Sequence, residues 1–347
     1  MNLGDFGVSE FDNENSLFST SKTKQNQAAL SKKRKANKIS NEQDNKIERD
    51  EVERAMIESI TIAKAELLPR SDDTDSDSDS LQFSILQNKF LEFGLCVVTN
   101  LFSPDAITTH LTPAASFYLK ILEDQLSAKK IIYKSNSTNN FSHFAFREVA
   151  GRQYGRIDSR VGLPTPEDPT VMFGPKHLSA PPFPLEQILS PFLTSTINSL
   201  LGGTAALTYA GLIYSFPGSQ DQDFHQDGVP LFPEEDIDLP PYALNVFIPL
   251  HKLKKTHGLT EFFPRSNQPH IAIDLSNLDL SKESLKIGRT IQPLLSVGDA
   301  LIYDYRVCHR GVANSNTGNT RTMLYLMYSR PWFKEHVNFD NERKLFS

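Results

Sequence analysis

The chain has 347 residues, of which 39% are hydrophobic and 22% charged, and its formal net charge at pH 7 is −6. Its two cysteines, Cys96 and Cys308, exclude a disulfide framework and a Cys-x-x-Cys motif. No apolar run reaches the roughly 18 residues of a membrane span, and the N-terminus lacks the basic and apolar regions of a signal peptide. We therefore expect an intracellular protein, cytoplasmic or nuclear, with no membrane partner.

Residues 1–80 differ in composition from the rest of the chain. They carry 12 Lys and Arg, 17 Asp and Glu, and only three aromatic residues, all of them Phe. Such a segment cannot bury enough apolar surface to offset the entropy lost on folding. We expect a mostly disordered charged tail over residues 1–80 and one folded domain over residues 81–347.

The tail itself is segregated by charge. Residues 20–40 are basic, with seven Lys and Arg and no acid, and residues 71–80 hold five Asp in an extended acidic linker. Between them, residues 45–68 repeat apolar side chains at near-helical spacing, which predicts an amphipathic helix. The basic part contains one run of four consecutive cations: Lys32, Lys33, Arg34 and Lys35. This run could be a nuclear import signal for an import receptor, a binding patch for an acidic partner, or a solvated stretch without function.

The folded part opens with helices. A short helix ending at Gly94 leads into an apolar strand over residues 95–98. Ser103 before Pro104 predicts the start of a second helix, because serine caps a helix N-terminus and proline suits the first turn. Residues 185–202 predict a further helix.

Strand-like runs dominate the rest of the chain, separated by clusters of Gly, Pro, Asn and Asp. They read "ALTYAGLIYSF", "YALNVFIPL", "LTEFFP", "DALIYDYRVCH" and "RTMLYLMYS". Regularly punctuated strands after early helices predict a mainly β fold, a sandwich or barrel with helices packed outside.

The stretch "DFHQDGVP" places His225 and Asp227 two residues apart, and alternate residues of a strand point to the same side. Both side chains can therefore address one metal ion. His309 is the third candidate, because an extended segment over residues 299–309 would place it on one face with apolar and aromatic side chains. Two histidines and one carboxylate leave positions open, as in non-haem Fe(II) oxygenases. Zinc takes the same donors, and His309 alone can equally be a strand cap with a satisfied hydrogen bond.

Arg321 follows the hairpin-like segment "GVANSNTGNT", which would return it beside the strand that ends at His309. A guanidinium buried there must be paired, and its planar fork suits a carboxylate. An exposed arginine, or one paired with Asp304, is the alternative. A metal with open positions and an arginine that holds a distant carboxylate fit a chelating 2-oxo acid.

The order His-x-Asp, "LNVFIPL", "GLTEFFPRSN" and "VGDALIYDYRVCHRGVAN" with Arg321 resembles the phytanoyl-CoA dioxygenase family over roughly residues 83–332. That family consists of Fe(II)- and 2-oxoglutarate-dependent oxygenases with a double-stranded β-helix, or jelly-roll, core. One departure is the sequence Pro-Arg-Ser-Asn over residues 264–267, where the family has Pro-Gly-Ser-His; the missing glycine puts the local turn in doubt.

The resemblance implies roles for six residues. The iron ligands would be His225, Asp227 and His309, and Arg321 would hold the distal carboxylate of 2-oxoglutarate. Asn245 and Tyr214 would be either polar groups on the cosubstrate side or ordinary structural residues. The cofactors would then be Fe(II), 2-oxoglutarate and dioxygen, and a retained aspartate implies hydroxylation or another oxidation of a small-molecule or acyl substrate rather than halogenation.

Two other functions use the same residues: a zinc hydrolase, and a catalytically inert metal-binding barrel in a nuclear regulatory protein. The folded part has a net charge near zero, which argues against nucleic-acid binding by the domain.

Several other residues attract attention and are given ordinary roles. We expect His251 and His257 to face solvent and Cys308 to be packed. "GRQYGRIDSR", residues 151–160, is either an exposed strand or loop or a contact for an anionic substrate.

Overall fold

The computed structural model describes residues 46–68, 77–134, 143–161, 183–228, 231–232, 237, 239–268, 289–334, 343 and 345. The predicted basic segment 20–40, with Lys32–Lys35, lies outside these residues, as do residues 71–76 of the predicted acidic linker. The chain divides into two units between Ala55 and Met56. Residues 46–55 of the first unit are helical, and every strand belongs to the second unit.

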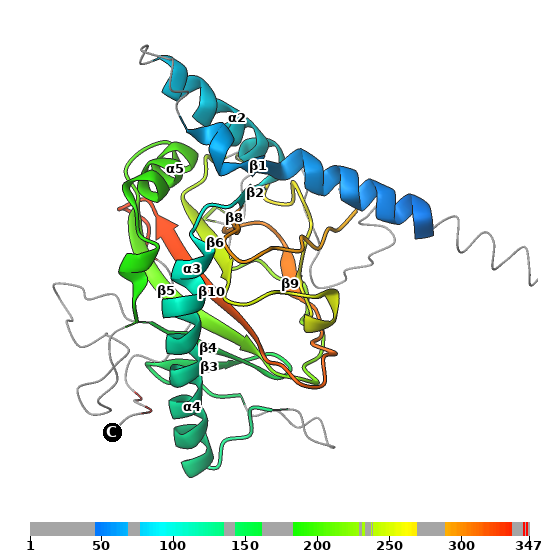
Figure 1. The fold of residues 1–347 in the computed structure, drawn as a ribbon, viewed down its shortest axis with the longest axis vertical. Helices are drawn as coiled ribbons and strands as arrows, with labels where there is room; N and C mark the ends of the chain where they lie inside the picture. The colour runs from blue at the N-terminus through cyan, green and yellow to red at the C-terminus, as the bar shows by residue number, and fades with distance from the viewer. Residues whose placement is uncertain are drawn as a thin grey trace, which may run out of the picture. The chain divides into compact units, whose positions relative to one another are not determined.

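The helices of the second unit end where the sequence signals predict, but two of them begin elsewhere. Helix α2 spans Asp77–Phe93, so it begins within the predicted acidic linker, and it stops before Gly94, whose φ is 76°. The helix predicted over residues 185–202 is a 3₁₀ turn at Leu185–Gln187 followed by α5 (Pro191–Leu201). Ser103 caps α3 (Pro104–Ala106) by accepting a hydrogen bond from the Ala106 amide. A π-helical turn over Ile107–Leu111 continues into α4 (Thr112–Ala128), and α5 (Pro191–Leu201) ends at Gly202 (Figure 1).

In the part of the chain that the structure describes, ten strands form two sheets. The large sheet has the order β1-β2-β8-β6-β10-β5-β4-β3, and the small sheet pairs β7 with β9. Only β1 and β2 are parallel; the other pairs are antiparallel. The strands are β1 (Thr61–Ala63), β2 (Leu95–Thr99), β3 (Val149–Arg152), β4 (Arg156–Arg160), β5 (Ala206–Ser215), β6 (Ala243–Pro249), β7 (Thr260–Phe262), β8 (Ala300–Asp304), β9 (His309–Gly311) and β10 (Arg321–Ser329).

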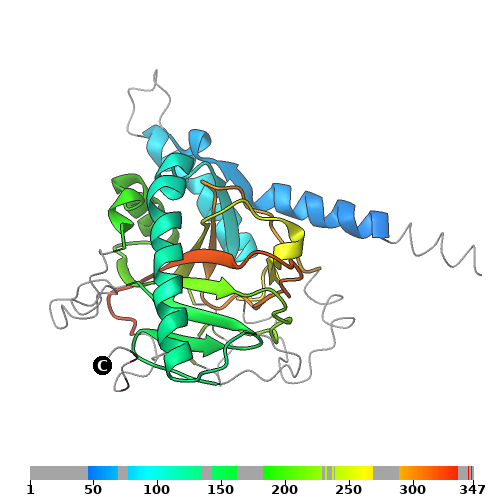
Figure 2. The same cartoon turned by 60° about the horizontal axis from the view of Figure 1, so that its bottom comes forward.

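From β5 onward the chain alternates between the two sheets. It leaves β5 of the large sheet for His225, which bridges to His309 in the small sheet, and returns as β6. It then crosses to β7 and Ile291, returns as β8, crosses to β9, and ends as β10 between β5 and β6. This alternation closes a double-stranded β-helix, so the predicted jelly-roll core is confirmed. Figure 2 shows the barrel with α4 running along its outside.

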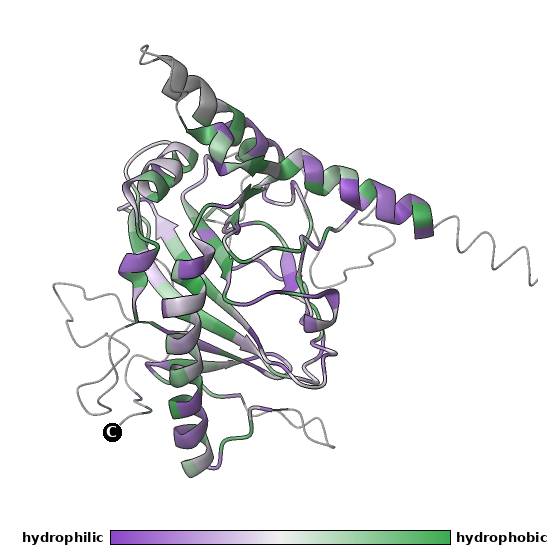
Figure 3. Ribbon diagram, in the orientation of Figure 1, coloured by the Kyte–Doolittle hydropathy of each residue, from purple (hydrophilic) through white to green (hydrophobic). Residues whose placement is uncertain are grey.

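The two faces of the large sheet have different environments. Outward-facing residues of the central strands pack with α4 and α5 in one apolar cluster that includes Tyr118, Leu193, Val246 and Leu324. Figure 3 shows hydrophobic and hydrophilic residues alternating along α4, as expected for a helix with one buried face. The opposite face of the sheet lines the barrel interior, where the candidate site lies.

The sheet extends into the segment that sequence analysis assigned to the tail. The predicted helix 45–68 is helical over residues 46–60 and then gives way to β1 and a 3₁₀ turn at Lys64–Leu67. Ile60, Ile62 and Leu67 are at most 2% exposed. A three-residue strand is too short to show a period of two in the sequence, so only its pairing with β2 defines it.

Candidate metal centre

The barrel encloses a cavity of about 380 Å³ that both sheets line. The large sheet contributes side chains from β4, β5, β6, β8 and β10, and the small sheet contributes Thr260, His309 and Gly311. Polar groups gather at three places in it. The first is a cluster of two imidazoles and a carboxylate, the second is a pair of arginines, and the third is an arginine–aspartate ion pair beside a tyrosine.

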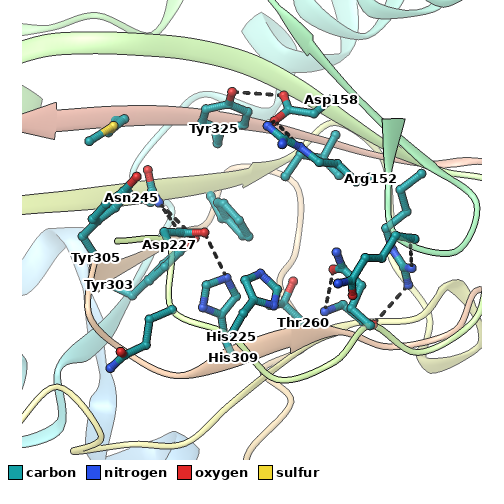
Figure 4. Close-up of a pocket in the computed structure, with 18 of the residues that line it drawn as sticks. Arg152, Asp158, His225, Asp227, Asn245, Thr260, Tyr303, Tyr305, His309 and Tyr325 are labelled. Atoms are coloured by element: carbon teal, nitrogen blue, oxygen red, sulfur yellow. Dashed lines mark hydrogen bonds and ion pairs between the residues drawn. The ribbon is translucent and has the colours of Figure 1, made fainter. Parts of the chain in front are cut away.

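His225, Asp227 and His309 come together as the sequence spacing predicts. One ligand atom of each lies within 4.8 Å of the others, and no second group of this kind occurs among the described residues. Backbone hydrogen bonds of 2.9 Å in both directions join His225 to His309 and place their rings 4.6 Å apart. Asp227 Oδ1 lies 3.6 Å from His309 Nε2. Figure 4 shows the three side chains pointing toward one another.

Backbone carbonyls fix the orientation of both imidazoles. His225 Nδ1 lies 2.8 Å from the Asp223 carbonyl, and His309 Nδ1 lies 2.9 Å from that of Val307. A carbonyl can only accept, so each Nδ1 carries the proton and each Nε2 keeps a free lone pair for a metal. Burial lowers the pKa of His309 to about 4, with His225 adding to the effect and Asp227 opposing it, so this ring is neutral at pH 7.

Asp227 is held by two donors through its other oxygen. Its Oδ2 accepts hydrogen bonds from Asn245 Nδ2 at 2.7 Å and from the Tyr303 hydroxyl at 2.8 Å. Burial and the neighbouring carboxylate raise the pKa of Tyr303 well above its usual value, so this hydroxyl stays a donor. Asn245 therefore lines the cavity and orients the aspartate; the cosubstrate-side role that the resemblance implied for it stays a prediction. Tyr303 was recognisable in the sequence only by its place on the predicted apolar and aromatic face.

The segment from residue 299 to residue 309 is broken rather than continuously extended. β8 ends at Asp304, a turn follows, and β9 begins at His309 in the other sheet. Tyr303 and His309 still reach the same cavity, because the two sheets face each other across it. Asp304 pairs with Arg306 at 2.7 Å, which leaves the alternative pairing of Asp304 with Arg321 wrong.

Arg321 is buried in the cavity wall, as predicted, with 3% of its surface exposed. It donates to the Gly258 carbonyl through Nη1 and to Ser215 Oγ at 3.0 Å through Nη2. Its Nε has no hydrogen-bond partner in the part of the chain that the structure describes. Burial lowers the pKa of the guanidinium to about 9, and nearby Arg156 adds to the effect.

Tyr214 does not belong to this site, and its predicted cosubstrate-side role is wrong. Its side chain lies on the helix-covered face of the large sheet, fully buried, where its hydroxyl donates to the Ala115 carbonyl at 2.7 Å. Successive strand residues point to opposite faces, so Ser215 faces the cavity side and Tyr214 cannot.

The two histidines that were expected to face solvent both accept backbone hydrogen bonds. His257 is 3% exposed and its Nδ1 accepts from the Lys254 amide at 2.9 Å. His251 is half-buried and its Nε2 accepts from the Thr322 amide at 3.0 Å. The solvent-facing prediction is therefore wrong, although neither histidine joins the metal-ligating group.

The arginine-rich segment 151–160 is a buried hairpin of β3 and β4, not an exposed strand or loop. Arg156 is 1% exposed and lines the cavity. Arg152 also lines it, in an ion pair of 2.5 Å with Asp158. Asp158 in turn accepts a hydrogen bond from the Tyr325 hydroxyl (Figure 4). Cys308 is fully buried, as predicted, and burial raises its pKa to about 12.

The turn at residues 264–267 forms without the family's glycine. Arg265 takes the left-handed conformation, with φ at 71°, that glycine favours. Its guanidinium pairs with Glu92 at 2.5 Å and lies 4.7 Å from the ring centroid of Phe93. Asn267 donates to Asp304 at 3.3 Å, so the departure from the family pattern leaves the site intact.

Comparison with known proteins gives few sequence relatives. No family model matches the chain. It is 24% identical over 154 residues to dioxygenase af480 of Aspergillus fumigatus, which covers 44% of this chain and 47% of that protein. The chain thus spans about half the length of the curated relative that it matches. This likeness to a dioxygenase agrees with the resemblance found in the sequence motifs.

Among solved structures, the chain is similar to AviO1 from Streptomyces viridochromogenes Tue57, with a TM-score of 0.45, 17% identity, and coverage of 72% of this chain and 95% of that one. It is also similar to SnoN, a non-haem α-ketoglutarate-dependent epimerase from nogalamycin biosynthesis, with a TM-score of 0.46, 15% identity, and coverage of 72% and 82%.

The fold and the site together define a class. A double-stranded β-helix that carries two histidines and one carboxylate in its interior has the scaffold and the donor set of non-haem Fe(II) oxygenases. The same cavity also contains the buried arginine Arg321. None of the described helices is long and apolar enough to cross a membrane.

Proposed function

We propose that this protein is an Fe(II)- and 2-oxoglutarate-dependent oxygenase of the phytanoyl-CoA dioxygenase type that hydroxylates a C–H bond of a small-molecule or acyl substrate. The observation that carries the proposal is the presence, in one cavity, of a two-histidine-one-carboxylate cluster and a buried arginine without a carboxylate partner among the described residues. The curated relative, a dioxygenase, supports the same activity.

His225, Asp227 and His309 would hold the metal, and their local contacts fit that task. Both Nε2 atoms have free lone pairs, and Asp227 Oδ1 stays available because Oδ2 takes both donors. Three such donors on one side of a metal leave room for a bidentate 2-oxo acid and for dioxygen. When bound, iron and 2-oxoglutarate supply the oxidising power, with dioxygen consumed and succinate and carbon dioxide released.

Arg321 would hold the far carboxylate of 2-oxoglutarate. A buried guanidinium without an anion is costly. Among the described residues, this one hydrogen-bonds only a carbonyl and a hydroxyl, and its Nε has no partner. The ligand that removes this cost is an acid whose other end reaches the metal cluster in the same cavity.

Aromatic side chains pack against His309, the most deeply buried of the three candidate ligands. Phe262 stacks on His309 with ring centroids 5.6 Å apart, and Tyr303 lies 5.0 Å from the same imidazole. Tyr209, Tyr305 and Met327 line another part of the cavity. Their largely apolar surface suits a carbon skeleton, so we place the oxidised substrate there.

The test is an anaerobic titration of the metal-free protein with Fe(II) and then 2-oxoglutarate, followed by visible absorption. We expect the weak charge-transfer band of an iron-bound 2-oxo acid, and after admission of air we expect succinate. A zinc hydrolase would show neither the band nor succinate, and an inert barrel would show the band at most. Absence of the band in protein that has bound iron would refute the proposal.

A further inference from the structure

Arg321 is not the only buried cation at its end of the cavity. Arg156 of β4 pairs in register with Ser215 of β5, and Ser215 pairs in register with Arg321 of β10. Residues directly opposite in neighbouring strands point to the same face. The three side chains therefore form a row, which we call the arginine row, with the two arginine Cα atoms roughly 10 Å apart across two strand spacings.

Both arginines of this row are almost completely buried, at 1% and 3% exposure, and both line the cavity. Burial lowers the pKa of Arg156 to about 10, and Asp221 opposes the effect. Within the described residues neither arginine forms an ion pair, in contrast to Arg152 of the same cavity, which pairs with Asp158. Two like charges in one buried row are unfavourable unless an anion lies between them.

In both guanidinium groups the nitrogen without a hydrogen-bond partner among the described residues is Nε. Arg156 uses Nη1 and Nη2 on backbone carbonyls, at 2.7 Å from that of Gln220 and 2.9 Å from that of Val312. Arg321 uses its Nη atoms on Gly258 and Ser215. In both, Nε is buried and lacks a hydrogen-bond partner among the described residues. The Nη contacts thus hold the two guanidinium planes in place and leave the Nε–H of each without a partner among the described residues.

Gly311 allows the side chains of Arg156 and Gln222 to pack closely against β9. A Cβ at this position would lie 3.1 Å from Arg156 Nε and 2.6 Å from Gln222 Oε1. Gly311 itself lines the cavity. The absence of a side chain here lets the buried Nε of Arg156 lie directly against the β9 backbone at the cavity wall.

We propose that Arg156 is a second binding residue for the distal carboxylate of the 2-oxo acid, and that the arginine row selects dicarboxylic over monocarboxylic 2-oxo acids. The inference rests on the proposed function. One carboxylate has two oxygens, so it can accept one N–H from each arginine. A monocarboxylic 2-oxo acid would bind the metal equally but would leave both cations buried without an anion.

The test compares two acids that share the chelating end. Anaerobic Fe(II)-loaded protein is titrated by calorimetry with 2-oxoglutarate and with 2-oxobutyrate, which lacks the distal carboxylate. Arg156→Gln should weaken 2-oxoglutarate binding by about tenfold or more, the loss of one charge-assisted hydrogen bond, and leave 2-oxobutyrate binding unchanged. Arg156→Lys, which keeps the charge but has no Nε–H, should show a smaller loss of the same selectivity.

Arg152→Gln is the matched control, because that arginine lines the same cavity but is already neutralised by Asp158; it should not change the ratio of the two affinities. Binding of 2-oxobutyrate also reports that each variant is folded. Unchanged 2-oxoglutarate affinity in both Arg156 variants, or an equal loss for both acids, would overturn the inference and leave the proposed function standing. A parent protein that binds neither acid would overturn both.

Discussion

Tyr303 of β8 donates a hydrogen bond of 2.8 Å to Oδ2 of Asp227, a residue 76 positions earlier in the chain. Asn245 of β6 donates to the same oxygen and lies 3.1 Å from the Tyr303 hydroxyl. The carboxylate of a loop residue is thereby fixed by two strands of the large sheet. Its remaining oxygen is directed toward His309.

Removing one of these donors should loosen the candidate metal site without unfolding the barrel. We expect Tyr303→Phe to weaken Fe(II) binding by about tenfold, the usual effect of losing a partner that orients a ligand. Equilibrium dialysis of Fe(II) under argon measures it. Tyr214→Phe is the matched control, because it removes a hydroxyl from the opposite face of the sheet and should leave iron affinity unchanged. Equal iron affinity in Tyr303→Phe and the parent would contradict the orienting role.

The cluster itself should be necessary for metal binding. Asp227→Ala or His309→Ala should abolish stoichiometric Fe(II) binding, because two remaining ligands cannot hold a divalent ion against water. In the parent protein, Fe(II) should also raise the unfolding temperature, since a ligand that binds only the folded state stabilises it. That increase should disappear in both variants. A variant that still gains stability from Fe(II) would place the metal elsewhere.

Arg321→Ala should separate binding of the cosubstrate from binding of the metal. We expect it to retain Fe(II) and to lose about 2–4 kcal/mol of 2-oxoglutarate binding, the range for a buried charge-assisted contact. The measurement is the concentration of 2-oxoglutarate that half-saturates the charge-transfer band. If Arg321→Ala were half-saturated at the same 2-oxoglutarate concentration as the parent, Arg321 would not be a binding residue for the cosubstrate.

Two histidines outside the site predict how stability depends on pH. Burial lowers the pKa of both His251 and His257 below 6.5, and each accepts a backbone N–H as a neutral ring. The unfolded chain therefore binds more protons than the folded chain just below pH 6.5, so the free energy of unfolding is highest above that pH and falls as the solution is acidified through it. Urea unfolding at pH 7.5 and pH 5.5 measures the difference. In His257→Gln the difference should shrink, and an unchanged difference would mean that other groups cause it.

Two truncated chains, one beginning at Met56 and the other at residue 81, should differ in stability. A chain that begins at Met56 keeps the whole second unit and should turn over 2-oxoglutarate as the parent does. A chain that begins at residue 81 lacks Ile60, Ile62 and Leu67, which are at most 2% exposed. Their burial contributes roughly 5 kcal/mol, comparable to the whole stability of a domain. Circular dichroism and succinate release from both truncations test this, and equal behaviour would show that β1 is dispensable.

The jelly-roll core and the metal cluster could be predicted because their signals are local. His225 and Asp227 are two residues apart, and the strands that carry His309 and Arg321 have apolar runs bounded by turn residues. The two-residue period of a strand predicted correctly that Tyr303 faces the barrel interior. It did not predict the hydrogen bond from Tyr303 to Asp227. What the sequence could not give was the break after Asp304 that moves the chain from one sheet to the other.

The errors arise where a side chain's role depends on long-range register. Tyr214 and Ser215 are neighbours, and a shift of one residue exchanges their faces. Only the pairing of β5 with β10 decides that Ser215 joins Arg321. In the same way, the sequence does not distinguish the three arginines within residues 151–160 from one another. The pairing of β4 with β5 decides that Arg156 lies in the cavity wall.

The short strand β1 has a consequence for solubility. It occupies the outer side of β2, so the large sheet there ends in three residues instead of five. Without β1, the unpaired amides and carbonyls of the apolar strand β2 would be available to a strand from another molecule. By covering this edge, β1 reduces pairing between molecules and the precipitation that such pairing causes at high concentration.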